Sequence, residues 1–316
     1  MAKKPEGEAS RLDEAARAGW LYYIAGNTQD EIAGKLGVSR QTAQRLVSLA
    51  VSERLIKVRL DHPIAKCLDL SERLRHKYAL QLCEVVPADP GSPSTTLGVA
   101  EAMAAELQRR LESQHPIIIA MGSGRTLRAA VEQLPPMDCP QHKIVSLVGN
   151  IAPDGSASFY DVIMRIADAV KAPHYPMPLP VIASTIHEKA LFLAQKSVIS
   201  VVDLARQADV TFVGVGQMGD SAPLVQDGFV NAAEMRALVK AGAVGEIVGW
   251  AFDARGNLIE GLTNDRVASV ALDQPATRLV VAVAMGVFKA KALKAALAGR
   301  LITGLITNET TADLLL

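Results

Sequence analysis

A glycine-rich loop between an expected strand and an expected helix is the clearest place for ligand chemistry in this sequence. Residues 121–126 (Met-Gly-Ser-Gly-Arg-Thr) follow an apolar run at 116–121 and open a helical pattern. The two glycines let the backbone approach an anion, and Arg125 can pair with a phosphate through two hydrogen bonds. The candidate phosphate-binding residues are Gly122, Ser123, Gly124, Arg125 and Thr126. The alternative is a tight turn whose glycines serve only the backbone.

The phosphate loop matches neither G-x-x-x-x-G-K-[ST] nor G-x-G-x-x-G, so it supports neither a nucleoside triphosphatase nor a dinucleotide site. A second glycine-containing loop, with Gly216 and Gln217, follows the expected strand at 210–215. Because parallel strands end at the same edge of a sheet, the two loops are expected to converge there. The alternative for the second loop is a flexible connection.

Two charged residues also follow expected strands. Lys289 falls in the first turn of a helix after the strand at 279–283. A cation is unfavourable at a helix N-terminus unless an anion is nearby, so Lys289 favours a ligand phosphate. Asp253 ends the strand at 246–252 and either accepts hydrogen bonds from sugar hydroxyls or stabilises the turn at 253–256.

Other chemistries lack support. The six histidines show no metal-ligand spacing, so we expect no metal site and no cofactor. Ser123 and Ser184 lack the G-x-S-x-G context of a hydrolase nucleophile. The three cysteines form no C-x-x-C pair and indicate a reducing compartment.

The sequence that starts at Thr28 has the spacing of two short helices joined by a tight turn. Thr28 and Glu31 form a capping box, the first helix ends at Gly37, and Ser39 caps the second helix. This arrangement predicts a helix-turn-helix. Apolar and basic residues then alternate over 55–60, which predicts the edge strand of a winged variant.

Basic side chains cluster around this helix pair. The N-terminal residues of a recognition helix reach base edges in the major groove, and flanking basic residues meet phosphates. We therefore expect Gln41, Thr42 and Arg45 to contact base edges. We expect Arg40, Lys57 and Arg59 to contact phosphates. The full set of candidate DNA-binding residues is Thr28, Gln29, Ser39, Arg40, Gln41, Thr42, Arg45, Lys57 and Arg59. A solvated basic face is the alternative.

Beyond residue 80, short apolar runs alternate with helical patterns, which predicts an α/β domain with a doubly wound, mostly parallel sheet. The expected strands are 80–86, 116–121, 143–148, 181–183, 210–215, 246–252, 279–283 and 301–306. We expect a DNA-binding domain over 1–60, a connector helix over 61–79 and an effector domain over 80–316. The apolar stripe Leu68, Leu70 and Leu74 and the apolar end 314–316 indicate either oligomer contacts or core.

Length and composition are compatible with this organisation. The 316 residues are 49% apolar, which predicts a folded chain and allows two domains. The 33 basic and 33 acidic side chains cancel, so the case for nucleic acid rests on local charge. No apolar run approaches the roughly 20 residues of a membrane-spanning helix, and we expect a cytoplasmic protein without a membrane partner.

Together these motifs resemble the SorC family of bacterial transcriptional regulators, often grouped with the DeoR-type sugar regulators. The resemblance rests on 28–42 with Arg45 and Leu46, and on the loop at 121–127. It also rests on Gly242-Ala-Val-Gly245, on Ala284-Met-Gly286 with Lys289, and on 305–309 with Ala312, Leu315 and Leu316. It covers nearly the whole chain, and it is the order of the motifs that makes it specific.

The resemblance implies a helix-turn-helix followed by a domain of the phosphosugar-isomerase type. That domain is expected to bind a sugar or sugar phosphate as inducer, commonly in a tetramer, without catalysis. The phosphate is expected to meet the loop at 123–126 and Lys289, while Asp253, Gly216 and Gln217 face the sugar. The expected function is regulation of a carbohydrate or polyol catabolic operon, with operator DNA and a small effector as partners and a dimer or tetramer as the assembly.

Two alternatives stay open at this point. One is a regulator of a neutral sugar or polyol, with Arg125 bonding to hydroxyls. The other is a sugar-phosphate isomerase or lyase on the same scaffold, with Asp253 as a general base and the Gly122 loop as the phosphate site. The fused helix-turn-helix and the lack of a paired acid and base near the proposed site disfavour the enzyme.

Overall fold

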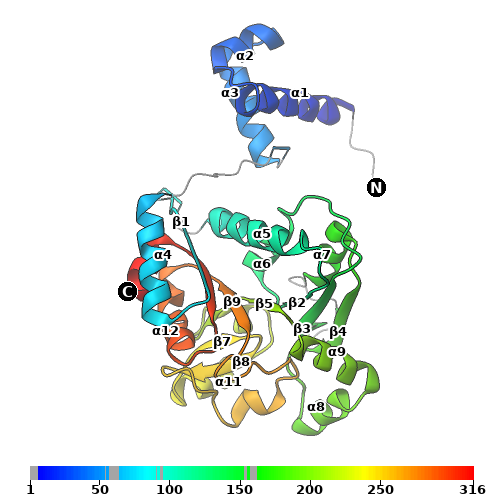
Figure 1. Cartoon of the computed structure of the whole chain (residues 1–316), viewed down its shortest axis with the longest axis vertical. Coiled ribbons are helices and arrows are strands. Elements are labelled where there is room, and N and C mark those ends of the chain that lie inside the picture. Colours follow the sequence, from blue (N-terminus) through cyan, green and yellow to red (C-terminus); the bar gives the residue numbers. More distant parts are fainter. Residues whose placement is uncertain are drawn as a thin grey trace. The chain divides into compact units, whose positions relative to one another are not determined.

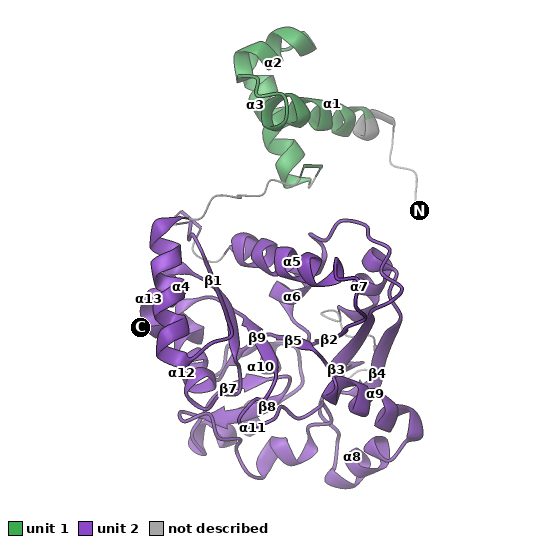
Figure 2. Cartoon of the chain, in the orientation of Figure 1, with its two compact units in different colours: residues 1–62 green, residues 63–316 purple. Residues whose placement is uncertain are grey.

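The structure is a computed structural model that describes residues 6–53, 55–56, 64–89, 91–92, 95–152, 155–156 and 162–316. The chain divides into two compact units, residues 1–62 and residues 63–316 (Figure 2). Lys57 and Arg59 of the expected wing lie outside the described residues.

The described part of the first unit consists of three helices, α1 (Glu6–Tyr23), α2 (Gln29–Leu36) and α3 (Arg40–Ser52). The capping box is present: the Thr28 hydroxyl accepts the Glu31 N–H, and the Glu31 carboxylate accepts the Thr28 N–H at 2.7 Å. Gly37 ends α2 in the left-handed region with φ of 67°, a conformation that glycine adopts without a steric penalty. The core consists of Ala15, Ala18, Ile32, Ala43, Leu46, Val47 and Ala50. Small alanines let α1 pack closely against α3.

The second unit contains a seven-stranded parallel sheet with the strand order β1-β10-β9-β5-β2-β3-β4 (Figure 1). The strands are β1 (Leu82–Val86), β2 (Ile118–Met121), β3 (Lys143–Ile151), β4 (His174–Pro180), β5 (Val210–Val213), β9 (Leu279–Val283) and β10 (Gly304–Asn308). The strand order reverses between β2 and β5, which are neighbours at the centre of the sheet. From β2 the chain continues to β3 and β4 towards one edge, and from β5 it continues to β9 and β10 towards the other. Parallel α/β sheets bind ligands at such a reversal, outside the carboxyl ends of the strands.

Helices cover both faces of this sheet, as the doubly wound prediction requires. The described helices of the second unit are α4 (Ala65–Tyr78), α5 (Leu97–Leu111), α6 (Arg125–Val131), α7 (Ile163–Val170), α8 (Ile186–Leu193), α9 (Lys196–Arg206), α10 (Pro223–Gln226), α11 (Ala232–Lys240), α12 (Ala290–Ala298) and α13 (Glu309–Leu315). Side chains of α5, α6 and α7 form one apolar cluster, and side chains of α4, α9, α12 and α13 form another. Alternate residues of β2 enter the two clusters, with Ile119 and Met121 in one and Ala120 in the other.

The expected strand at 246–252 is not one strand. The structure forms a hairpin of β7 (Ala243–Ile247) and β8 (Trp250–Asp253), which joins β6 (Gly216–Gln217) in a separate antiparallel sheet. The chain reverses at Val248 and Gly249, whose φ values are 46° and 91°. Two consecutive residues with positive φ make the tight turn that a hairpin needs.

Strand β4 is not among the expected strands, and its sequence contains Pro176, Pro178 and Pro180. Proline lacks a backbone N–H and is therefore tolerated in a sheet mainly at an edge. β4 is the last strand of the sheet and pairs with β3 alone. The expected strand at 181–183 lies just after it and forms only an isolated bridge from Ile182 to Val267.

The apolar positions that indicated either core or oligomer contacts are divided. Leu70 and Leu74 of α4 and Leu315 of α13 are buried in the core, whereas Leu68 and Leu314 are exposed. The C-terminal end is held against α4: Lys77 Nζ donates to the backbone oxygen of Leu316 at 2.6 Å. Most of the α4 stripe therefore belongs to the core of the second unit.

The contact between β3 and β4 generates a stability prediction. A Cβ atom at Gly149 would lie 2.1 Å from the backbone oxygen of Leu179, and backbone cannot yield as a flexible side chain can. We expect Gly149→Ala to lower the free energy of unfolding by about 1–3 kcal/mol. Urea unfolding followed by circular dichroism measures this change.

Gly98→Ala is the matched control for Gly149→Ala. Its added methyl group meets only ordinary contacts, the nearest with Val86 at 3.4 Å, and alanine is the better helix former. We expect the control to retain or slightly increase stability. Equal losses in the two variants would contradict the assigned packing of β4.

Candidate functional site

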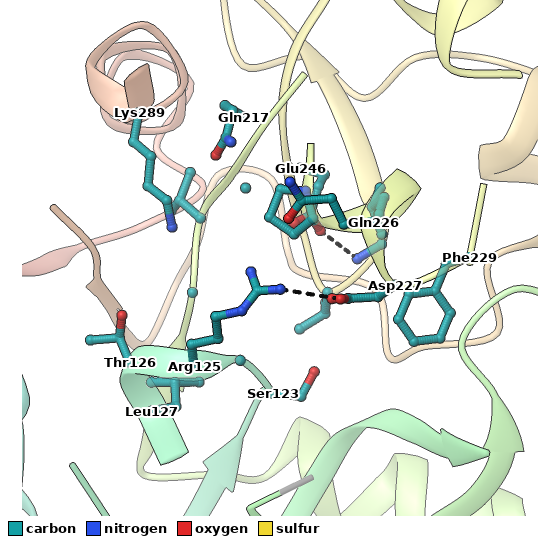
Figure 3. A pocket seen from close by; sticks show the side chains of 18 of the residues that line it. Ser123, Arg125, Thr126, Leu127, Gln217, Gln226, Asp227, Phe229, Glu246 and Lys289 are labelled. Carbon is teal, nitrogen blue, oxygen red and sulfur yellow. Dashed lines mark hydrogen bonds and ion pairs between the residues drawn. The ribbon is translucent and has the colours of Figure 1, made fainter. Parts of the chain in front are cut away.

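The carboxyl edge of the central strands contains a cavity of about 450 Å³ (Figure 3). It is bordered by the loops after β2, β5 and β9, by α10 and by the β7–β8 turn. Of the expected effector-binding residues, the cavity is lined by Ser123, Gly124, Arg125, Thr126, Gly216, Gln217 and Lys289. The sheet topology thus brings the two glycine-containing loops and Lys289 together.

Gly122 and Asp253 are not among the residues that line this cavity. Gly122 has a packing role instead, because a Cβ there would lie 3.3 Å from Val248 Cγ1 and 3.4 Å from the backbone oxygen of Phe212. Only its neighbours along the loop face the cavity.

The expectation that Asp253 faces the sugar requires correction. Its carboxylate Oδ1 accepts the backbone N–H groups of Arg255 at 2.8 Å and Asn257 at 2.9 Å. Partial burial raises the pKa of Asp253, but these hydrogen bonds outweigh that effect and lower it below its usual value. Asp253 therefore stabilises the turn after β8, the other role that the sequence allowed. The isomerase alternative loses the general base that it was assigned.

Two cations and two carboxylates meet in the cavity. Arg125 Nη2 lies 3.2 Å from Asp227 Oδ1, and Figure 3 shows the two side chains pointing towards one another. Glu246 Oε2 accepts the Gly249 N–H at 2.8 Å. Lys289 extends into the same cavity from the short helix at Val287–Lys289. The formal charges of these four side chains sum to zero.

Burial governs the protonation of this group. Desolvation raises the pKa of the Glu246 carboxyl, while the Gly249 hydrogen bond and the positive charge of Lys289 act in the opposite direction. Desolvation lowers the pKa of Lys289, and Glu246 opposes that shift. Each residue therefore favours the charged form of the other in a recess where a lone charge is costly.

Gln217 carries an acceptor suited to a ligand hydroxyl. Its Nε2 donates to the backbone oxygen of Ser221 at 3.4 Å. Its Oε1 is buried and finds no hydrogen-bond partner among the residues that the structure describes. A buried polar atom without a partner costs free energy, and a bound hydroxyl group would remove that cost.

Sequence reasoning missed Asp227 and Glu246. Glu246 directly follows the Gly242–Gly245 motif, so the motif lies next to Glu246 in the sequence but does not predict that Glu246 lines the cavity. Its position depends on Gly216, the partner of Glu246 in the β6–β7 pair, because a Cβ at Gly216 would lie 2.0 Å from Glu246 Oε1. Asp227 follows the α10 turn, and nothing in the local sequence distinguishes it from an ordinary loop aspartate.

In the first unit, the expected base-reading residues lie near the start of α3. Gln41 and Arg45 are exposed, and the Ser39 hydroxyl accepts the Thr42 N–H at 3.2 Å as the helix cap. Arg40 forms an ion pair with Asp30 of α2 at 3.5 Å. The exposed face of α3 also includes Gln44, which sequence reasoning did not select. Gln44 lies one helical turn from Gln41, so the two share a face.

Thr28 and Gln29 lie at the start of α2, where Thr28 is exposed and serves as the helix cap.

The structure describes no helix that is long and apolar enough to span a membrane. Within the same described ranges, no three His, Cys, Asp or Glu side chains are grouped to hold a metal ion.

The fold and the cavity define a class of ligand-binding regulator domain, and comparison with known proteins agrees. Residues 62–316 match the family model described as "Putative sugar-binding domain". The full-length sorbitol operon regulator SorC from Klebsiella pneumoniae superposes with a TM-score of 0.69 at 25% identity, covering 97% of this chain and 99% of that one. A DeoR family transcriptional regulator from Listeria monocytogenes shares the fold of 79% of this chain and 99% of its own, with a TM-score of 0.71 at 21% identity.

Sequence relatives extend over both units. The erythritol catabolism regulatory protein EryD of Brucella abortus is 36% identical over 96% of this chain and 96% of its own length. The transcriptional regulator LsrR of Klebsiella pneumoniae is 30% identical over 94% of this chain and 90% of its own. The chain belongs to the SorC family of bacterial sugar-responsive transcriptional regulators.

The corrected role of Asp253 is testable by substitution. Asp253→Ala removes the acceptor of two backbone N–H groups, and we expect it to lower the free energy of unfolding by about 1 kcal/mol. Because Asp253 lies away from the cavity, the affinity for any ligand bound there should change less than about twofold. Denaturant unfolding and calorimetric titration measure the two quantities. A large loss of affinity without a loss of stability would restore Asp253 to the binding site.

Proposed function

We propose that this protein is a DNA-binding regulator of a carbohydrate or polyol catabolic operon. A sugar phosphate or polyol phosphate bound in the cavity at the carboxyl edge of the sheet controls its affinity for the operator. The observation that carries this proposal is the placement of Arg125 and Lys289 in the same cavity as the unpartnered acceptor of Gln217. Cations suit a phosphate, and the amide oxygen suits a hydroxyl.

The local backbone also suits an anion. Gly124 has φ of 134° at the start of α6, with open space where a side chain would lie. Within the part of the chain that the structure describes, no side-chain hydrogen bond caps the N-terminus of α6. An anion placed at this loop meets backbone donors as well as Arg125.

A neutral sugar or polyol is the second candidate for the effector. The observation that favours it is the presence of Asp227 and Glu246, which balance the charges of Arg125 and Lys289. Carboxylates accept hydrogen bonds from hydroxyl groups and repel a phosphate. Because the relative EryD is named for erythritol catabolism, a test panel should contain four-carbon polyols with and without a phosphate ester.

For DNA binding, we propose that α3 enters the major groove. Gln41, Thr42 and Arg45 then face base edges, with Thr28, Gln29 and Ser39 near the backbone. Arg40, Lys57 and Arg59 are assigned to phosphates. The support comes from the capped helix pair, the exposure of Gln41 and Arg45, and membership in a regulator family. A dimer or tetramer on the operator belongs to the same proposal.

The effector must bind one arrangement of the protein more tightly than another, because a ligand with equal affinity for both shifts no equilibrium. A direct test measures operator binding with and without each member of the polyol panel. An effector changes the operator affinity, whereas a mere ligand changes only thermal stability. Conversion of the phosphate ester during incubation would instead indicate an isomerase.

Arg125→Gln separates the two candidate effectors. A hydrogen bond to a charged group contributes about 1.5–3 kcal/mol, so loss of the guanidinium should weaken binding of a phosphate ester by about 10- to 100-fold. The affinity for the parent polyol should change much less. Calorimetric titration of both compounds measures the ratio. Equal losses for the two compounds would favour the neutral effector.

Arg45→Ala tests the assignment of α3. We expect it to lower operator affinity by about 1–3 kcal/mol and to relax the preference at one base pair. Binding titrations against operator variants, after selection of the operator from a random duplex pool, measure both effects. Arg11→Ala on α1 removes the same charge and should leave the base preference unchanged. Retention of the full preference by Arg45→Ala would contradict direct base readout.

A further inference from the structure

The ion pair between Arg125 and Asp227 places a carboxylate where a ligand anion is expected. Arg125 Nη2 and Asp227 Oδ1 are 3.2 Å apart, and both residues line the cavity. Among the described residues, Arg125 is the partner found for the Asp227 carboxylate. The guanidinium therefore already holds an anion that belongs to the protein.

Asp227 is poorly solvated in this position. Its side chain retains only 21% of its accessible surface, against 51% for Arg125. Burial raises the pKa of the Asp227 carboxyl, and the charge of Arg125 acts against that shift. A carboxylate that has lost much of its water depends on its cation, so separation from Arg125 carries a cost.

Asp227 also has a local means of moving. It follows the four-residue helix α10, and its N–H donates to the backbone oxygen of Pro223 at 2.8 Å. The next residue is Gly228, with φ of 75° and no atom of the described residues within 4 Å of the position that a Cβ would take. Rotation about the Asp227 side-chain bonds, or an adjustment at Gly228, can carry the carboxylate away without disturbing the sheet.

We propose that Asp227 is a specificity-determining residue that occupies the anion position beside Arg125 and excludes inorganic phosphate from the cavity. The inference rests on the proposed function of this cavity as the site of a phosphorylated effector. A phosphate on the edge of the guanidinium that Asp227 occupies would lie close to a carboxylate, and like charges at short distance repel. A phosphate group that binds at this edge must therefore displace Asp227.

As a consequence, the part of the ligand other than its phosphate group determines whether the ligand binds. Inorganic phosphate gains only the contact with the cations and pays the whole cost of displacing Asp227. A phosphate ester of a sugar or polyol also supplies hydroxyl groups, which can donate to Gln217 Oε1 and Glu246. Specificity of this kind uses a repulsive element against the wrong ligand together with attractive contacts to the right one.

Asp227→Asn tests the inference with inorganic phosphate as the probe. The substitution keeps the shape of the side chain and removes its charge. Thermal unfolding of the full chain is followed over a phosphate series at constant ionic strength, which yields a dissociation constant from the stabilisation. We expect the variant to bind phosphate at least about tenfold more tightly than the original chain. Asp220→Asn changes an exposed aspartate that precedes α10; it controls for general charge and should change the affinity less than twofold.

A double variant locates the effect. Arg125→Gln combined with Asp227→Asn should lose the gain in phosphate affinity, because the released guanidinium is then absent. Equal behaviour of Asp227→Asn and Asp220→Asn would overturn the inference. So would weaker or undetectable binding of phosphate by Asp227→Asn, which would make Asp227 a ligand contact or an unrelated residue. Unfolding midpoints without phosphate verify that each variant is folded.

The inference and the proposed function fail in different experiments. One outcome is that no phosphate ester in the polyol panel binds the original chain while Asp227→Asn gains affinity for inorganic phosphate. The inference that Asp227 occupies the anion position is then supported, and the proposal of a phosphorylated effector is wrong. If an ester binds and alters operator affinity while Asp227→Asn gains nothing, the proposed function stands and Asp227 has no selective role.

Discussion

The mutual neutralisation of charges at the carboxyl edge of the sheet is the constraint on which the cavity depends. Lys289 sits in a recess where desolvation makes an isolated charge costly, whereas Arg125 keeps about half of its accessible surface. Asp227 pairs with Arg125, and the charge of Glu246 opposes the effect of desolvation on Lys289. A ligand therefore enters a site in which the formal charges of the side chains already sum to zero. A ligand anion that binds there replaces a carboxylate of the protein as the partner of a cation.

The sheet topology explains why these residues meet although they are far apart in the sequence. Strands β9, β5 and β2 are neighbours and run in the same direction. Their carboxyl ends deliver Lys289, Gln217 and Arg125 to one edge. Sequence reasoning reached this convergence because it depends on strand order and direction, and buried parallel strands show as continuous apolar runs. The capped helix pair of the first unit was equally readable, because capping is a local interaction between Thr28 and Glu31.

The remainder of the site depends on tertiary contacts that local patterns do not encode. The hairpin turn at Val248 and Gly249 places Glu246 in the cavity, whereas a single strand over 246–252 would have carried it elsewhere. The sequence around Asp253 is compatible with a contact to a sugar and with a role in a turn. The positions of the Arg255 and Asn257 N–H groups, which donate to the Asp253 carboxylate, favour the role in the turn. Asp227 pairs with a residue 102 positions away in the sequence.

The prolines of β4 bear on how this family member can associate with itself. Pro176, Pro178 and Pro180 stand at every second position, so three hydrogen-bond donors are missing from the same side of the strand. An edge without donors is a poor template for another strand, which guards the sheet against unlimited growth by edge pairing. A second copy of the chain that docked on this edge would have to use side-chain surfaces and not backbone pairing.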